Sequence, residues 1–481
     1  MRRWTVFLSL ILAVCIAGIC FVCASAAKNG DRVMFTEECV YGDPHAADGL
    51  TVDTHVTWNY HLFWDMKQAL GTDPAPITKC SFTAANPYTT YVGEGSHFRM
   101  ESVIAYGFSV SGDVSGMDDK YTMPGLSAVY SEMYESAKVG EEISRHVRIA
   151  DYYDYYPLDL SFYLPGTVVS NNDVDLSLPS AEIESILLQE KGSERYVTYR
   201  FLEYFRIPII AGEERILTMT KGTGSGVSWG YEHAGDHTYS LYSVSAITDN
   251  TCYFTFNTLT NKGDTVDTSL LPDGYGIFAF SYGKGTASHT GIDADSLSMV
   301  YPLPLGCTVY DLLYDEQANK LLLVLGAEEG IRLQWIDRDT MECTKEILLR
   351  GNGYRFLNCR DGYFVISTDE TLAVIDTSAA IPSLSLECDL PADTIGNDLF
   401  YFRGDSAFDY DGKRLAIADY LRRDGFYGEQ SSYFVAVVSA DGLLGCSTYT
   451  SSLDSYTSRY FSSAYHVQPN FQKPITVSWK P

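Results

Sequence analysis

The sequence predicts an all-β protein that is built from repeated antiparallel hairpins and preceded by one apolar helix. Short runs rich in Val, Leu, Ile, Tyr and Phe alternate with Asp-Gly, Asn-Gly and Glu-Gly pairs, the pattern of strands joined by tight turns. The same order of strands and turns recurs three times in the C-terminal half. A basic and then apolar segment begins the chain, which is typical of an exported protein.

Residues 1–27 are predicted to be a signal peptide or an N-terminal transmembrane anchor. Arg2 and Arg3 precede an uncharged apolar run over residues 4–23, and Ala24–Ala26 supplies the small residues of a signal-peptidase site. The apolar run has about 20 residues, which is long enough to span a bilayer. Cleavage and anchoring therefore stay open as alternatives, and both place the rest of the chain outside the cytoplasm.

Residues 28–190 are predicted to form a β-rich N-terminal domain. Leu50–Trp64 alternates between apolar and polar residues, which indicates one long half-buried strand or a hairpin. Leu126–Lys138 is predicted to be a helix, with Pro124 near its start and Gly140 after its end. This region forms either a separate domain or additional copies of the repeat that follows.

Residues 191–481 are predicted to form a domain of repeated four-stranded units. Val309–Leu349, Tyr354–Leu390 and Phe400–Leu453 each contain four short strands separated by turns. A period of roughly 40 to 50 residues with four strands per unit is what a β-propeller blade requires. Tyr196–Ser298 is interpreted as two further blades, so we expect a propeller of six to seven blades, and eight at most.

Individual strands and cysteines refine this interpretation. Val197–Phe201 is interpreted as a strand of the upstream blades. Ile475–Trp479 is expected to be a closing strand, because an open propeller leaves unpaired sheet edges. Cys343, Cys388 and Cys446 fall in the predicted last strand of their repeats, and we expect them to be small buried thiols.

The repeat resembles a known superfamily. Asp409–Ala418 resembles the inner strand of YVTN-type and WD-repeat-like β-propellers, in which an Asp-Gly-Lys turn leads into an apolar strand. Leu333–Asp337 and Leu372–Asp376 look like the following strand, which ends in Asp. The resemblance covers the C-terminal half only, and Trp335 is followed by Ile336 instead of the Asp of a true WD repeat. It implies the propeller architecture and carries over no functional residue.

The charge of the chain argues against two classes of partner. The formal net charge is -28, and it becomes -30 when the two N-terminal arginines are removed (-28 - 2). An acidic surface repels the phosphate backbone of nucleic acids and the headgroups of anionic lipids. We therefore expect no nucleic-acid partner, and membrane contact only through the N-terminal segment if that segment is not cleaved.

One stretch is a candidate ligand site. Between Asp151 and Asp159 carboxylates alternate with aromatic rings, and we predict Asp151, Tyr152, Asp154 and Tyr155 to be ligand-binding residues. Such a pattern suits a sugar, because rings stack on pyranose faces and carboxylates accept hydrogen bonds from hydroxyl groups. The alternative is an exposed strand or loop that packs its Tyr side chains on a neighbouring segment.

Three other motifs predict no site. Gly226–Gly230 matches the G-x-S-x-G pattern around Ser228, but its flanks indicate a Gly-rich loop with no helix after it, whereas a nucleophile elbow needs that helix. His233 and His237 lack a helix that would align both rings on a metal. Asp409–Gly412 is better explained as a hairpin turn than as part of a calcium loop. We predict no catalytic residue, no metal ligand and no cofactor.

Taken together, these features favour an extracytoplasmic, non-catalytic β-propeller that binds a protein or glycan partner at the cell surface. One alternative is a secreted or anchored hydrolase or lyase acting on glycan or peptide, with Asp154 or Ser228 in the propeller mouth. Another is an accessory subunit of a membrane complex, held by an uncleaved N-terminal segment.

Overall fold

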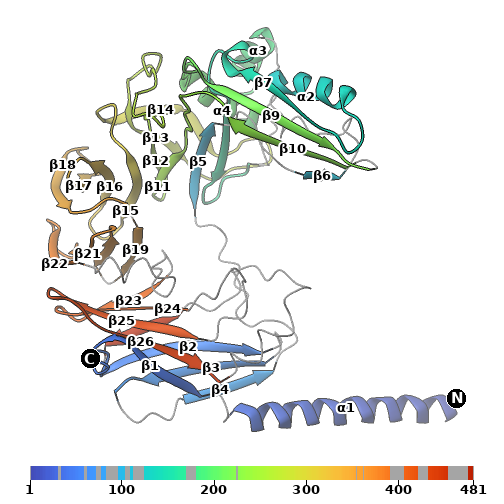
Figure 1. The fold of residues 1–481 in the computed structure, drawn as a ribbon, viewed down its shortest axis with the longest axis vertical. Coiled ribbons are helices and arrows are strands. Elements are labelled where there is room, and N and C mark those ends of the chain that lie inside the picture. Colours follow the sequence, from blue (N-terminus) through green and yellow to red (C-terminus); the bar gives the residue numbers. More distant parts are fainter. Residues whose placement is uncertain are drawn as a thin grey trace. The chain divides into compact units, whose positions relative to one another are not determined.

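The computed structural model forms two compact units (Figure 1). The first unit contains residues 1–93, 329–331 and 349–481, and the second contains residues 94–328 and 332–348. The structure describes residues 2–30, 34–58, 62–71, 77–82, 96–102, 109–111, 124–169, 180–223, 226–353, 355–360, 362–389, 406–420, 432–452 and 475–479.

The first unit contains three antiparallel sheets. Their strands are β1 (Phe35–Gly42), β2 (Leu50–Trp58), β3 (Leu62–Ala69), β4 (Ile77–Phe82), β19 (Arg355–Arg360), β20 (Tyr363–Ser367), β21 (Thr371–Asp376), β22 (Ser383–Asp389), β23 (Ala407–Tyr410), β24 (Leu415–Tyr420), β25 (Tyr433–Ser439), β26 (Gly442–Ser451) and β27 (Thr476–Trp479). They pair in the orders β19-β20-β21-β22, β1-β26-β25-β24-β23 and β27-β2-β3-β4. In this unit, the repeat predicted at Tyr354–Leu390 is the meander β19–β22, and the repeat predicted at Phe400–Leu453 contains the meander β23–β26. Parts of the latter repeat, such as residues 421–431, lie outside the described residues.

The sheet of β23–β26 is buried on both faces. Leu415 and Ile417 of β24 pack in one cluster with residues of β20–β22. Ala416 and Ala418, which point the other way, pack in a second cluster with Leu50 of β2. Because both faces are covered, this strand has an unbroken apolar sequence instead of the alternation expected of a half-buried strand.

Both ends of the chain enter this unit's sheets. The N-terminal strand β1 pairs antiparallel with β26, from Phe35 opposite Ser451 to Gly42 opposite Gly445. The C-terminal strand β27 pairs with β2, as the closing-strand hypothesis requires. Two sheets therefore combine strands from both sides of the boundary predicted at residue 190. Leu50–Trp64 adopts the hairpin alternative, as β2 and the start of β3.

Arg414 holds the C-terminal strand in place. Its guanidinium carbon lies 3.9 Å from the centroid of the Trp479 ring, within the range of a cation–π contact. The Trp479 amide donates to Asp409 Oδ2 at 2.6 Å. Arg414 also donates to the Ala46 carbonyl at 3.5 Å, so one side chain touches segments from both ends of the chain.

The N-terminal helix α1 (Arg2–Gly30) has exposed apolar side chains. Trp4, Phe7 and Phe21 keep 72%, 56% and 74% of their surface accessible. Within the part of the chain that the structure describes, no helix combines the length and the hydropathy needed to cross a membrane. The signal or anchor assignment therefore stays a prediction.

The second unit combines blade-type meanders with other elements. Its strands are β5 (His97–Ser102), β6 (Ser109–Ser111), β7 (Glu142–Arg148), β8 (Leu158–Tyr163), β9 (Glu214–Lys221), β10 (Gly226–His233), β11 (Ser243–Ile247), β12 (Thr251–Phe256), β13 (Gly276–Tyr282), β14 (Ile292–Pro302), β15 (Val309–Asp315), β16 (Lys320–Ala327) and, apart from residues 330, 331 and 349, β17 (Gly330–Asp337) and β18 (Cys343–Leu349). Its helices are α2 (Pro124–Ser136), α3 (Ser180–Gln189) and α4 (Glu194–Tyr204). The strands pair as β11-β12-β13-β14, β15-β16-β17-β18, β6-β10-β9-β7 and β5-β8.

Several predictions for this unit are confirmed and others are wrong. Tyr196–Ser298 does not supply two blades, because β9 and β10 pair with β6 and β7, which leaves one meander, β11–β14. The repeat at Val309–Leu349 is the meander β15–β18, and the helix predicted at Leu126–Lys138 is α2. The interpretation of Val197–Phe201 as a strand is wrong, because it lies in α4. The Ser193 hydroxyl caps that helix by accepting the Tyr196 amide at 3.1 Å. Four of the five residues from 197 to 201 are buried, so this stretch taken alone shows no polar face that would reveal a helical period.

The cysteine prediction is confirmed in part. Cys343, Cys388 and Cys446 do lie in the last strands β18, β22 and β26 of their meanders. Cys388 and Cys446 are buried, but Cys343 is exposed. Cys343 is the first residue of β18, an outer strand whose first half faces solvent.

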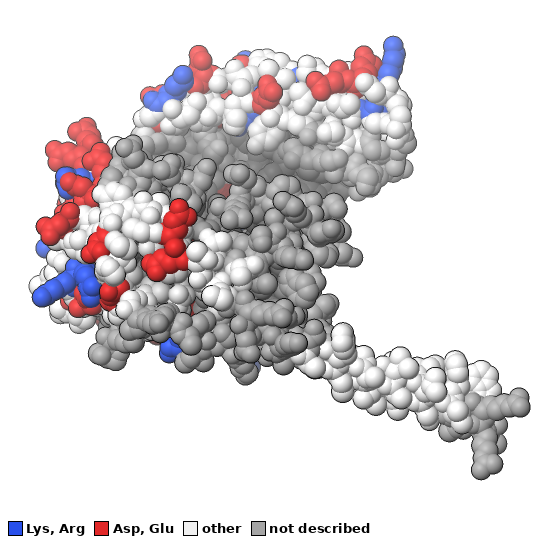
Figure 2. Space-filling view, turned by 60° about the horizontal axis from the view of Figure 1, so that its bottom comes forward, with Lys and Arg blue, Asp and Glu red and all other residues white. Residues whose placement is uncertain are grey.

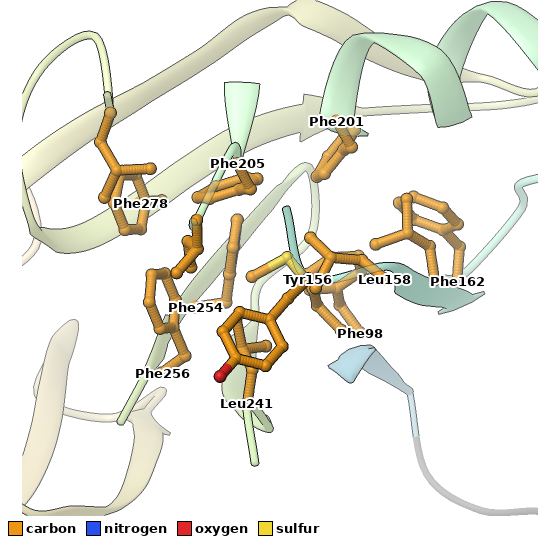
Figure 3. Packing of buried hydrophobic residues seen from close by; sticks show 14 of the residues in the cluster. Phe98, Tyr156, Leu158, Phe162, Phe201, Phe205, Leu241, Phe254, Phe256 and Phe278 are labelled. Carbon is orange, nitrogen blue, oxygen red and sulfur yellow. The ribbon is translucent and has the colours of Figure 1, made fainter. Parts of the chain in front are cut away.

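An aromatic cluster joins α4 to the strands of the second unit (Figure 3). The ring centroid of Phe201 lies 5.3 Å from that of Phe162 on β8. Phe205 lies 5.0 Å from Phe278 on β13, and Phe98 on β5 lies 4.7 Å from Phe254 on β12. These contacts fasten the β5–β8 pair and α4 to the meander β11–β14. They also fix the start of β8 and the segment after α4, which together carry the candidate site.

Candidate functional site

The predicted ligand-binding stretch begins at a short 3-10 turn, Ile149–Asp151. Arg148 holds the Asp151 carboxylate with two hydrogen bonds, at 2.8 and 3.2 Å. Tyr152 is half-buried and packs against the hydrophobic core of the second unit. These two side chains are therefore engaged within the protein.

Asp154 and Tyr155 lie beside the segment that follows α4. Asp154 is exposed, and its carbonyl accepts the Ile209 amide at 3.2 Å. Tyr155 pairs with Pro208 in an isolated antiparallel bridge and keeps 39% of its surface exposed. The guanidinium of Arg206 lies 6.0 Å from the centroid of the Tyr155 ring. Of the four predicted residues, these two have accessible side chains next to this segment.

A pocket of about 390 Å³ lies on the segment that pairs with this stretch, and we call it the 208–267 pocket. Its lining residues are Pro208, Ile209, Ile210, Ala211, His237, Thr260, Asp264, Thr265 and Asp267. The first four residues form an apolar wall, and the other five present an imidazole, two hydroxyl groups and two carboxylates. The volume falls within the roughly 300–1,000 Å³ of small-molecule sites.

The polar wall is a tight loop. The Thr260 amide donates to the Asp264 carbonyl at 2.8 Å, and Leu259 bridges to Thr265. His237 Nδ1 lies 3.2 Å from Asp264 Oδ2, which connects the loop to the segment before β11. The loop geometry thus presents its polar side chains toward one pocket.

Asp267 is a fixed hydrogen-bond acceptor in this wall. Its Oδ1 accepts the Ser269 amide at 2.9 Å. This hydrogen bond, with one from the Ser269 side chain, holds the pKa of Asp267 below its usual value of 3.8. The carboxylate is ionised at neutral pH.

A buried carboxylate supports the apolar wall from behind. The Glu213 side chain is fully buried and forms an ion pair with the equally buried Arg215. Glu213 Oε2 also accepts the Tyr156 hydroxyl and the Tyr239 amide, each at 3.1 Å. The Tyr156 hydroxyl in turn accepts the Ile210 amide at 3.5 Å. Glu213 therefore joins three segments. They are the segment after α4, which lines the pocket, the segment at Tyr156, which leads into β8, and the segment at Tyr239, which leads into β11.

Burial and pairing act in opposite directions on Glu213. Burial raises the pKa of Glu213, against the opposing effects of Arg215, the Tyr239 amide and the Tyr156 hydroxyl. Burial also raises the pKa of Tyr156, so this hydroxyl stays protonated and able to donate. The network is a structural support of the pocket and has no exposed reactive group.

The serine motif does not form a nucleophile elbow. Ser228 lies inside β10, opposite Thr220 of β9 and Ser109 of β6. The prediction of a Gly-rich loop for this motif is wrong, since the segment is a paired strand. The glycine at position 230 allows close strand pairing, because a Cβ there would come within 2.8 Å of the Thr218 hydroxyl oxygen.

The residues of the histidine and aspartate motifs also make structural contacts. His233 ends β10, whereas His237 lines the pocket and contacts Asp264. Among the described residues, no group of three His, Cys, Asp or Glu side chains is arranged to hold a metal. Asp411 accepts the amides of Lys413 and Arg414 at 2.9 and 2.7 Å, which confirms the hairpin turn. Gly412 has a φ of 92°, which favours glycine.

Sequence reasoning missed the pocket itself. Thr260, Asp264 and Asp267 lie in a loop with ordinary turn residues, and no spacing distinguishes it from other loops. Glu213 stands in an acidic and basic run, Glu213–Arg215, that looks like a solvated turn. The useful signal was the neighbouring tyrosine-rich stretch, which pairs with the apolar wall.

The surface charge agrees with the composition. On the face shown in Figure 2, the acidic side chains of the described residues form several separate groups, and basic side chains stand beside some of them. None of the nine residues that line the 208–267 pocket is Lys or Arg. The pocket therefore carries negative charge from Asp264 and Asp267.

Known structures similar to this chain include a β-propeller domain. An Hsv2 protein with loop 6CD replaced by a Gly-Ser linker is 6% identical, and the match covers 42% of this chain and 65% of that chain, less than two thirds, with a TM-score of 0.21. The β-propeller domain of Cps50 (Swd1) from Myceliophteria thermophila is 12% identical over 49% of this chain and 79% of that one, with a TM-score of 0.22. Apo AztD from Citrobacter koseri is 10% identical over 51% and 86%, with a TM-score of 0.22.

No protein-family model matches the chain, and no curated protein matches it in sequence. The similarities to solved structures are too low to carry any statement about a ligand.

Proposed function

We propose that this chain is an extracytoplasmic, non-catalytic β-propeller protein that binds a saccharide in the 208–267 pocket. The observation that carries the proposal is the division of the pocket into an apolar wall and a wall of hydroxyl and carboxylate groups. A pyranose has the same division, with C–H faces and hydroxyl edges. The exposed Tyr155 ring beside the apolar wall offers a stacking surface for a second sugar unit.

The carboxylates of the pocket suit binding better than catalysis. Glycoside hydrolysis needs one carboxylic acid whose pKa is raised, so that it donates a proton at neutral pH. The pKa of Asp267 is lowered instead. Asp267 is therefore suited to accept hydrogen bonds from sugar hydroxyl groups.

The propeller and its compartment are part of the proposal. Four described sheets are four-stranded and of the blade type, namely β11–β14, β15–β18, β19–β22 and β27 with β2–β4, and a fifth consists of the meander β23–β26 with β1 added at its edge. They support a propeller of six to eight blades. The basic and apolar start of the chain, residues 1–27, supports export. Detection of the protein only inside cells, with residues 1–27 intact and no membrane association, would contradict the extracytoplasmic assignment.

A glycan array probed with the full chain tests the binding proposal. Ala211 is an exposed residue of the apolar wall, so Ala211→Trp fills the pocket without disturbing the core. Ala287→Trp is the matched control, because Ala287 is exposed on the same unit and does not line the pocket. We expect saccharide binding that Ala211→Trp abolishes and Ala287→Trp retains. Binding that survives Ala211→Trp, or no binding to any saccharide, would overturn the proposal.

A further inference from the structure

The pocket has a one-sided charge that restricts its ligand. Asp264 and Asp267 contribute two carboxylates, and no Lys or Arg lines the pocket. Arg215, the basic residue nearest in the supporting network, is buried and paired with Glu213. Arg206 lies over the Tyr155 ring, outside the lining. The Asp264 carboxylate has the imidazole of His237 as a partner, and Asp267 accepts from the uncharged Ser269. A sugar that carries a carboxylate or sulfate would therefore meet negative charge here.

The polar wall also has acceptors in excess. Asp267 accepts from Ser269, and its two carboxylate oxygens have further lone pairs that can accept from a ligand. Thr260 is buried, with 8% of its surface exposed. Its hydroxyl oxygen accepts the Lys262 amide at 3.2 Å. A hydroxyl oxygen that already accepts a bond is free to donate to a ligand oxygen or nitrogen. The carboxylates therefore suit a ligand that brings N–H donors and a positive charge, and the Thr260 hydroxyl suits an oxygen of the same ligand.

We infer that the 208–267 pocket selects a saccharide bearing a free ammonium group, as in a chain of glucosamine units. This inference rests on the proposed saccharide-binding function and adds the charge of the ligand. The ammonium group would lie between the carboxylates of Asp264 and Asp267, and the C–H face of the ring would pack on Ile209 and Ile210. Charge-assisted hydrogen bonds are stronger than neutral ones, so the ammonium provides most of the selectivity.

The test compares three soluble tetrasaccharides by titration calorimetry on the full chain at mildly acidic pH, where the amino groups of the sugar are protonated, with a chelator present. They are a glucosamine tetramer, which is cationic, its N-acetylated form, which is neutral, and a galacturonate tetramer, which is anionic. We expect the cationic tetramer to bind about tenfold tighter than the neutral one, from one charged hydrogen bond, and the anionic one not to bind. The chelator excludes a contribution from contaminating metal ions.

Three variants separate the possible outcomes. Asp264→Asn and Asp267→Asn keep the shape of the pocket and each remove one of its two charges, so each should reduce the tenfold preference for the cationic tetramer by about threefold. Asp249→Asn removes the same charge from an exposed residue outside the pocket and should leave the preference unchanged. Equal affinity for the cationic and neutral tetramers, lost in Ala211→Trp, would overturn the charge inference and leave the saccharide site standing. Failure of every tetramer to bind, or binding that Ala211→Trp leaves intact, would overturn both.

Discussion

Burial disfavours the ionised form of the Glu213 carboxyl group, whereas its charged and hydrogen-bonding neighbours favour that form. A fully buried carboxylate is stable only when its partners replace the hydrogen bonds that water would make. Arg215, the Tyr156 hydroxyl and the Tyr239 amide supply those partners. One residue therefore sets the position of three segments around the pocket.

Replacing Glu213 by Ala should destabilise the second unit strongly. The substitution leaves Arg215 charged and buried without its partner, which costs about 3–5 kcal/mol in comparable buried pairs. Urea unfolding followed by fluorescence measures this loss. The double variant Glu213→Gln with Arg215→Met is the control, because it removes both charges and should recover most of the stability. A loss below about 1 kcal/mol for Glu213→Ala would contradict the supporting role of this network.

Among the elements, α4 has the largest effect on the site. Its apolar residues enter the aromatic cluster, and the segment that follows it becomes the apolar wall of the pocket. A helix buried on most of its surface draws its stability from packing and its cap more than from intrinsic propensity. Loosening α4 should therefore loosen the pocket.

The substitution Phe201→Ala tests this dependence. It removes a fully buried ring and should cost about 3–5 kcal/mol. Hydrogen exchange should rise in α4 and in residues 207–213 of the wall. Glu203→Ala, on the exposed side of the same helix, should change neither quantity beyond the small loss of its ion pair with Arg200. Increased exchange confined to α4 would show that the wall is held independently.

Asp295 makes the attachment of α4 to β14 depend on pH. Lys191 and the Tyr196 hydroxyl hold its carboxylate, and they lower the pKa of Asp295 below its usual value of 3.8. A lowered pKa in the folded state means that the carboxylate stabilises the fold above the pKa of the unfolded chain. This contribution is lost as the pH falls through the lower folded value.

Melting temperatures of the natural chain and Asp295→Asn should therefore converge in acid. We expect the natural chain to melt higher at neutral pH and the gap to close as the pH falls below 3.8, the usual pKa of this carboxyl group. Asp249→Asn, an exposed carboxylate elsewhere on the unit, is the control and should show no comparable gap. A gap for Asp295→Asn that is independent of pH would contradict this assignment.

At the scale of the whole molecule, strands from near both ends of the chain pair within the first unit. The C-terminal strand β27 lies on β2, and the N-terminal strand β1 lies on β26. The Trp479 ring under Arg414 and the Trp479 amide on Asp409 are the contacts that hold β27 at its end. Such a closure ties the stability of the first unit to residues far apart in the sequence.

Trp479→Ala should open this closure in part. A cation–π contact contributes about 0.5–2 kcal/mol, and its loss should increase hydrogen exchange in β27 and β2. Trp479→Phe keeps an aromatic face for Arg414 and should restore most of the protection. Equal exchange in the natural chain and in Trp479→Ala would show that backbone pairing alone fixes the strand.

The sequence predicted the meanders well because hairpin turns and strand periods are local signals. The strand order of Val309–Leu349 and the Asp411 turn could be predicted from neighbouring residues alone. The helix α4 could not, because the consecutive buried residues 196–199 look like an apolar strand and hide the helical period. The site was predicted only at its edge. Tyr155 gave a compositional signal, but the polar wall at Thr260 meets the apolar wall only through the fold.

The central claim, that the 208–267 pocket is the binding site, is tested most directly by hydrogen exchange of the full chain with and without the glucosamine tetramer. The proposed site predicts protection in residues 207–213 and 258–267 and little change in β1 or β26. Protection confined to other segments, with tight binding and no change in these two, would contradict it.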